Sequence, residues 1–147
     1  MRRTDRQDAG TLATGKCNKR EAAVLKFSKQ LAVVEYNFTY DGGAIGTYSL
    51  GVQLPAGAVV TDVYSDELTT LTSGGSATLQ LQAGSTNLTG AVAFDTGFTG
   101  VEKQALASSA TSIKPSASTK SELKLAIATA ALTAGKVRFA VEFYVSE

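Results

Sequence analysis

The stretch TYSLGVQLPAGAVVTDVYSDELTT, residues 47–70, decides the fold of this chain. Its first part places apolar side chains at every second position, at Tyr48, Leu50, Val52 and Leu54. This period of two is typical of a half-buried β-strand. Pro55 cannot donate to a strand ladder and Gly57 tolerates a positive φ, so the chain there must reverse or cross to a facing sheet. A second strand begins at Ala58.

The second strand starts less regularly than the first. Val59 and Val60 are both apolar, which predicts a β-bulge or burial of both faces next to the turn. The polar, glycine-bearing run 69–76 is expected to be a loop.

Other parts of the chain repeat the same alternation. Strands are predicted, in chain order, over 34–40, 77–83, 88–94, 122–127 and 136–145. The region 101–118 predicts an irregular connection with one short strand on each side. Residues 133–135 are interpreted as the loop of a final β-hairpin.

Seven to nine strands at intervals of roughly ten residues are typical of a sandwich or barrel. We predict an all-β fold, an eight-stranded jelly-roll-like antiparallel sandwich with an extended N-terminal arm. An immunoglobulin-like sandwich is the second choice, but the chain has no Trp and no cysteine pair to favour it.

Composition limits the class of protein. With 147 residues the chain fits one domain that can bury a core without disulfides, and its single cysteine, Cys17, cannot form an internal bridge. No run approaches the roughly 20 apolar residues of a membrane span, and the N-terminal residues lack the apolar core of a signal peptide. We therefore expect that the protein does not associate with membranes and that it folds in a reducing cytoplasm.

Charge is distributed unevenly. Residues 1–29 carry eight basic and three acidic side chains, a net charge of +5, whereas the remainder carries −4. We interpret residues 1–30 as a basic arm, extended or with one short helix over 21–27, and residues 31–147 as the sandwich domain. The candidate contact residues of the arm are Arg2, Arg3, Arg6, Lys16, Lys19, Arg20, Lys26 and Lys29. A solvated, partly disordered tail is the alternative for this arm.

Catalytic chemistry is hard to find in this sequence. The chain has no histidine, which removes Ser-His and Cys-His nucleophiles and the usual transition-metal sites. Asp62, Asp66 and Glu67 are close in sequence, but solvent-facing charges explain them better than a glycosidase pair or a Ca²⁺ site. The glycine-rich run 42–46 lacks the pattern of a phosphate loop and is expected to be a turn. We predict no enzyme activity, no cofactor and no metal.

Aromatic side chains mostly occupy alternating strand positions and are expected in the core rather than on a base-stacking surface. These are Tyr36, Phe38, Tyr40, Tyr48, Phe139 and Phe143. Tyr64 and Tyr144 are the candidates for an outward position.

Three segments together resemble a group of small proteins of tailed bacteriophages. They are Tyr48 to Val63, which reads YSLGVQLPAGAVVTDV, the Leu/Gln strand at 77–83, and the closing strand after Leu132-Thr133-Ala134-Gly135. The resemblance covers roughly residues 31–147 and consists of strands and turns without catalytic residues. It implies a head decoration, or cement, protein with a jelly-roll-like fold.

Such a protein would act mechanically. The resemblance implies that homo-oligomers, dimers or trimers, bind the outside of the capsid and bridge major capsid protein subunits, with the arm ordering on contact. A carbohydrate- or receptor-binding module of a tail fibre or baseplate is the alternative, although aromatic residues are only 7% of the chain. An enzyme acting on sugar polymers is disfavoured because no acid–base pair stands out. Nucleic-acid binding by the arm is a fourth, less favoured hypothesis.

Overall fold

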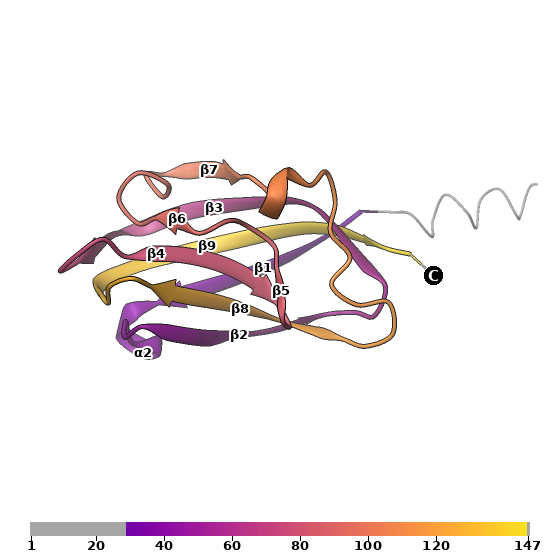
Figure 1. Ribbon diagram of the computed structural model, residues 1–147, viewed down its shortest axis with the longest axis horizontal. Helices are drawn as coiled ribbons and strands as arrows, with labels where there is room; N and C mark the ends of the chain where they lie inside the picture. The colour runs from indigo at the N-terminus through magenta and orange to yellow at the C-terminus, as the bar shows by residue number, and fades with distance from the viewer. Residues whose placement is uncertain (1–28, 147) are drawn as a thin grey trace, which may run out of the picture.

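A computed structural model describes residues 29–146, which form two antiparallel sheets packed face to face (Figure 1). The elements are, in order, β1 (Gln30–Asn37), α2 (Phe38–Asp41), β2 (Gly46–Leu54), β3 (Ala58–Ser73), β4 (Thr78–Ala83), β5 (Thr86–Asn87), β6 (Val92–Ala93), β7 (Val101–Gln104), the 3₁₀ turn η2 (Ala107–Ser109), β8 (Ser121–Ala128) and β9 (Leu132–Val145).

The strand order is that of a jelly roll. One sheet has the order β1-β9-β3-β7, and the other has the order β2-β8-β4-β5, with β6 also paired to β4. β5 pairs with the end of β4 and β6 with its start, so the two short strands share one strand position. The sandwich therefore has eight strand positions, four in each sheet, and the predicted jelly-roll-like fold is confirmed.

The turn at Pro55–Gly57 carries the chain from one sheet to the other. β2 pairs with β8, whereas β3 pairs with β9 and β7 in the facing sheet. Gly57 has φ +79°, and an added Cβ there would meet the backbone oxygen of Ser146 at 2.4 Å. The stretch 47–70 thus supplies one strand to each layer, and this turn connects the two layers.

The start of β3 contains the predicted irregularity. The pairing with β9 shifts register between Val60 and Asp62, which is a β-bulge, and residues 58–60 are all buried. The other end of β3 differs from the prediction. The strand extends to Ser73, because Thr72 and Ser73 pair with the first residues of β9 and the buried side chain of Leu71 anchors the segment. The prediction of a loop over 69–76 is therefore wrong for residues 69–73, which belong to β3.

The prediction of a final hairpin is wrong. Residues 133–135 lie inside β9, and β8 and β9 belong to different sheets, so the chain crosses between the layers at residues 129–131. Gly135 has φ +129° and lies against Leu71, whose Cδ2 atom would be 2.5 Å from an added Cβ. This glycine therefore allows close approach of two strands rather than a reversal of the chain.

The strand predicted over 34–40 ends at Asn37. The Asn37 side-chain oxygen accepts a hydrogen bond from the backbone N–H of Thr39 at 2.9 Å, and the backbone N–H of Asn37 donates to Asp41 Oδ2 at 2.9 Å. These local bonds stabilise the single helical turn α2, which Gly42 ends with φ +83°. Tyr40, expected in the core, is consequently 85% exposed.

The strand predicted over 88–94 is broken. Between β5 and β6 the Thr89 hydroxyl accepts a hydrogen bond from the Leu81 N–H at 3.0 Å, and the Gln80 side chain donates to the Thr89 carbonyl at 2.9 Å. These side-chain bonds accompany irregular backbone bonds from the Leu88 and Thr89 N–H groups to the Leu81 carbonyl, in place of a regular ladder. In the connection 101–118, β7 provides one short strand, and Ile113 forms an isolated bridge with Val60.

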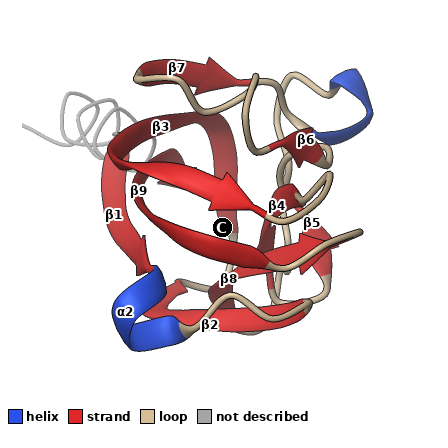
Figure 2. Ribbon diagram, turned by 90° about the vertical axis from the view of Figure 1, so that its left-hand side faces the viewer, coloured by secondary structure: helices blue, strands red, loops and turns tan. Residues whose placement is uncertain are grey.

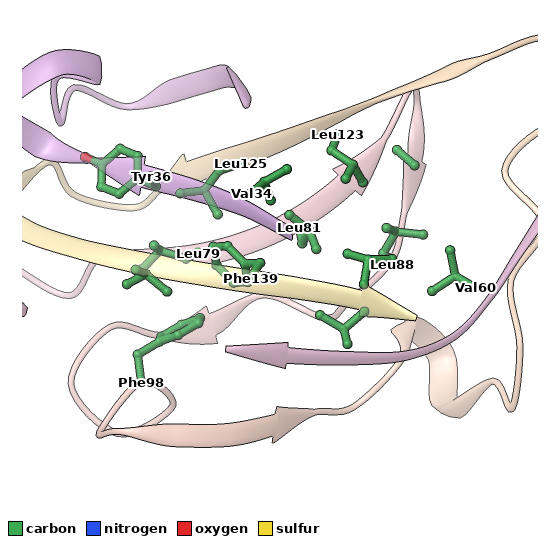
Figure 3. Packing of buried hydrophobic residues seen from close by; sticks show 14 of the residues in the cluster. Val34, Tyr36, Val60, Leu79, Leu81, Leu88, Phe98, Leu123, Leu125 and Phe139 are labelled. Atoms are coloured by element: carbon green, nitrogen blue, oxygen red, sulfur yellow. The ribbon is translucent and has the colours of Figure 1, made fainter. Parts of the chain in front are cut away.

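The core lies between the two sheets (Figure 3). Its largest fully buried side chains are Tyr36, Phe139, Leu54, Leu79, Leu81, Leu88, Leu123, Leu125, Ile127, Val60, Val63 and Val137. Phe98, from the loop before β7, packs edge to face on Phe139 with ring centroids 6.1 Å apart. Burial of each large apolar side chain contributes about 1.5–3 kcal/mol to the free energy of folding. This apolar core is therefore the main source of stability of the sandwich.

Candidate interaction surface

The outer face of the sheet β1-β9-β3-β7 carries a row of apolar side chains. In the ladder, Ala140 of β9 lies opposite both Val33 of β1 and Tyr64 of β3. Because the middle residue is an alanine, the larger neighbours enclose a shallow hollow of about 200 Å³, also lined by Val101 and Arg138. Val33 is 49% exposed and Val101 is 76% exposed. Apolar side chains gathered around a hollow on a sheet surface are typical of a protein-binding face.

Ion pairs flank this apolar row on the same face. The pairs are Lys103–Asp62 at 3.0 Å, Lys29–Glu142 at 3.4 Å and Lys136–Glu35 at 3.8 Å. The hydrogen bond from Lys103 is the main cause that lowers the pKa of the Asp62 carboxyl, and the same contact raises the pKa of Lys103. Exposed pairs of this kind add little stability but determine which surfaces can approach.

The three carboxylates at Asp62, Asp66 and Glu67, for which solvent-facing charges were the preferred explanation, make separate contacts. Asp66 lies opposite Arg138, which faces outward, whereas its neighbour Glu67 lies opposite the core residue Val137. Glu67 Oε2 accepts a hydrogen bond from the Leu71 N–H at 2.9 Å, so this carboxylate satisfies a backbone donor. Within residues 29–146 no group of three His, Cys, Asp or Glu side chains is placed to hold a metal ion.

The predicted arm contacts fall almost entirely outside the described residues. Lys29 is described and pairs with Glu142. The remaining candidates, Arg2, Arg3, Arg6, Lys16, Lys19, Arg20 and Lys26, lie in residues 1–28, as does the helix expected over 21–27. Their contact role stays a prediction.

The other assignments can be located. The run 42–46 is a turn, as expected: Gly42 ends α2 and Gly46 begins β2. Among the aromatic residues, Tyr36, Phe139 and Phe143 are buried, and Phe38 and Tyr48 pack half-buried against the core. Tyr64 is 38% exposed and lines the hollow, and Tyr144 is partly exposed.

The sequence analysis missed the row of Val33, Ala140 and Tyr64 as a surface. Tyr64 and Ala140 were placed on strands and Val33 was not, but the row itself arises from the order β1-β9-β3, which brings together segments far apart in the chain. The available signal was weak: Val33 precedes the alternating segment, and Ala140 occupies an outward position of the last strand.

Comparisons with solved structures found chains of similar fold. A chain of the cyanophage Pam1 capsid asymmetric unit superimposes with a TM-score of 0.60 at 19% identity, covering 99% of this chain and 100% of that chain. A chain of the Ralstonia phage GP4 capsid matches with a TM-score of 0.53 at 16% identity, over 96% of this chain and 94% of that one. A chain of the Helicobacter pylori bacteriophage KHP30 capsid matches with a TM-score of 0.52 at 16% identity, over 82% of this chain and 91% of that one.

These similarities concern the fold. No family model matches this sequence, and no curated protein matches it. In residues 29–146 no helix is long and apolar enough to cross a membrane.

Proposed function

We propose that this chain is a non-enzymatic structural protein of a bacteriophage particle that decorates the head. It binds the outside of the capsid and bridges subunits of the major capsid protein. The observation that supports this most strongly is the match to a chain of the Pam1 capsid, which extends over essentially the whole of both chains. Two further phage capsids contain chains of the same fold.

The described surface suits such a role. The outer face of β1-β9-β3-β7 offers the apolar row of Val33, Ala140 and Tyr64 between ion pairs, which is the composition of a protein-binding face. A closely packed two-layer core lies behind it, and a load on one edge of the sheet would pass to the other through the backbone ladder of β1, β9 and β3. A stiff brace of this kind resists separation of the subunits that it joins.

The basic arm supplies the second part of the proposal. Residues 1–30 carry the candidate contacts Arg2, Arg3, Arg6, Lys16, Lys19, Arg20, Lys26 and Lys29, which would meet acidic surface on a neighbouring capsid subunit. Binding that depends on these charges weakens as salt screens them.

A sedimentation assay tests the role directly. Purified protein is mixed with mature capsids of its phage, the capsids are sedimented, and bound copies are counted. Saturable binding at a simple ratio to the major capsid protein is expected. Absence from capsids, together with recovery on isolated tails or retention on a glycan array, would overturn the proposal in favour of a tail-fibre or baseplate module.

The arm is tested in the same assay. Deletion of residues 1–28 should lower capsid affinity, and the loss should shrink as salt increases, because the intact arm contributes mainly through charge. The matched control replaces the seven basic residues of 1–28 by glutamine and keeps the length. If this variant binds like the intact protein, charge on the arm has no part in binding.

A further inference from the structure

The sandwich has four open sheet edges, and β1 is the long regular one. All eight residues of β1, from Gln30 to Asn37, pair with β9 in unbroken register. Among the described residues no strand pairs with the other side of β1, which lies at the margin of the molecule (Figure 2). The strand contains no Gly, Pro or bulge. Its outward backbone N–H and C=O groups are therefore a template for a further strand.

The remaining edges are unsuited to pairing. β2 breaks its register with β8 between Ser49 and Gln53, where Gly51 has φ +80°. β7 has four residues, and β5 and β6 have two each with a gap between them. Bulges and short strands are common devices that prevent edge-to-edge association. β1 lacks both.

The outward side chains of β1 are complementary to themselves. With Lys29, the residue directly before β1, they read in order Lys29, Leu31, Val33 and Glu35, a cation, two aliphatic residues and an anion. In an antiparallel pair of two copies this order reverses, so that cation meets anion and aliphatic meets aliphatic. Leu31 is 60% exposed and Val33 is 49% exposed, which is unusual for adjacent aliphatic positions on one face of a strand.

We propose that two copies of this chain associate through β1, antiparallel and about a twofold axis at Ala32. Ala32 then lies opposite its own symmetry mate, Leu31 opposite Val33 of the second copy, and Lys29 opposite Glu35 of the second copy. The two four-stranded sheets become one eight-stranded sheet, and both outer faces lie on the same side. The backbone bonds give affinity, and the side-chain order sets the register.

The existing ion pairs extend this complementarity. Within one copy Lys29 contacts Glu142 and Glu35 contacts Lys136. At the interface Lys29 of one copy also meets Glu35 of the second copy. The four charges then alternate in sign along one line: Glu142 and Lys29 of the first copy, followed by Glu35 and Lys136 of the second copy. An interface that slipped by two residues would place Lys29 opposite an uncharged residue. The alternation therefore favours one register.

The oligomeric state of the full chain is the first test. Sedimentation equilibrium from about 1 to about 200 µM should give twice the monomer mass of 15.2 kDa at the upper concentrations. A monomer throughout, or a trimer, overturns the proposal. Val33→Lys should abolish the dimer, whereas Val101→Lys, the same change at a residue that is 76% exposed on β7, should leave it intact.

Charge reversal tests the register. Lys29→Glu and Glu35→Lys each place like charges opposite one another twice, and each should raise the dissociation constant by about tenfold or more. An equimolar mixture of the two variants should recover the dimer, because a Lys29→Glu copy facing a Glu35→Lys copy restores both opposite-charge contacts. Neither variant's internal repulsion, toward Glu142 or toward Lys136, is relieved by mixing. Failure of the mixture to associate overturns this register.

A control variant and a separate readout complete the design. Lys103→Glu breaks the Asp62 ion pair on the same face, on β7, which β9 and β3 separate from β1, and should not change the dissociation constant. The dimer is measured without capsids, and the decoration role is measured separately by capsid binding. A monomer that still binds capsids would therefore refute the dimer alone. A dimer that does not bind capsids would refute the decoration role alone.

Discussion

The Tyr36 hydroxyl donates a hydrogen bond to the backbone carbonyl of Gly42, joining the inner face of β1 to the glycine that ends α2. Tyr36 is completely buried. Burial is the main cause that raises the pKa of Tyr36 to about 12, with smaller contributions from Tyr48 and Asp41. This bond explains how a strand can end in a helical turn without leaving a polar group unpaired in the core.

Tyr36→Phe should lower the free energy of unfolding by about 1–2 kcal/mol at neutral pH, because the Gly42 carbonyl loses its partner. The pKa of Tyr36 is higher in the folded chain than its ordinary value of 10.0. The native protein should therefore lose stability as pH rises from about 10 to about 12, and the variant should lose less. Urea unfolding at a series of pH values measures both effects. An identical alkaline decline in the two proteins would contradict the assignment.

Gly43→Ala should destabilise the fold strongly. A Cβ at this position would lie 2.2 Å from the Leu132 carbonyl oxygen and 2.7 Å from the Phe38 ring. Either the start of β9 or α2 must move, at a cost of about 1–3 kcal/mol or more. Gly74→Ala is the matched control, since nothing lies within 4 Å of its added Cβ. Thermal unfolding of both variants decides the point, and equal melting temperatures would contradict the close approach.

Gln104→Ala should loosen β7. The Gln104 side chain donates from Nε2 to Ser65 Oγ at 2.8 Å and to the Gly97 carbonyl at 2.9 Å, and both Gln104 and Ser65 are buried. Its removal leaves one buried acceptor, Ser65 Oγ, and one partly buried acceptor, the Gly97 carbonyl, without this partner, at about 1–3 kcal/mol. Hydrogen exchange should accelerate in residues 97–104 more than in β1. Uniform acceleration over the whole sandwich would instead indicate a global loss of stability.

Lys103→Met should raise the pKa of the Asp62 carboxyl toward its ordinary value, because the hydrogen bond from Lys103 is the main cause that lowers it. A carboxyl whose pKa is lowered in the folded chain contributes stability above its ordinary pKa, and this contribution is lost as pH falls through the folded value. The variant should therefore be less sensitive to acid. A carbon-detected NMR titration of Asp62 measures the shift. An unchanged titration would show that the ion pair does not persist in solution.

Period-two alternation predicted the strands that pack on the core, because side-chain direction depends only on the local chain. It placed Val34, Tyr36, Leu79 and Phe139 correctly. It failed at Tyr40, where the side chains of Asn37 and Asp41 bond to nearby backbone and stabilise a helical turn. Alternation continues through such a turn without change, so the pattern carries no signal of it.

The sequence pattern could not predict which strands pair with one another, for a different reason. β8 and β9 alternate as two hairpin strands would, yet they lie in opposite sheets, and β9 instead joins β1 to β3. Which strands are neighbours depends on packing of the whole core. The row of Val33, Ala140 and Tyr64, and the open edge of β1, are products of that order and became visible only with the structure.

The position of β9 between β1 and β3 has a consequence for how the chain acquires its structure. Residues 30–37 must wait for residues 136–143 before either segment can complete its ladder. During synthesis on the ribosome, β1 and β3 are made long before the strand that joins them, with their apolar side chains unprotected. We expect complete folding to require synthesis of β9, to be slow for a domain of this size, and to be sensitive to aggregation at high expression.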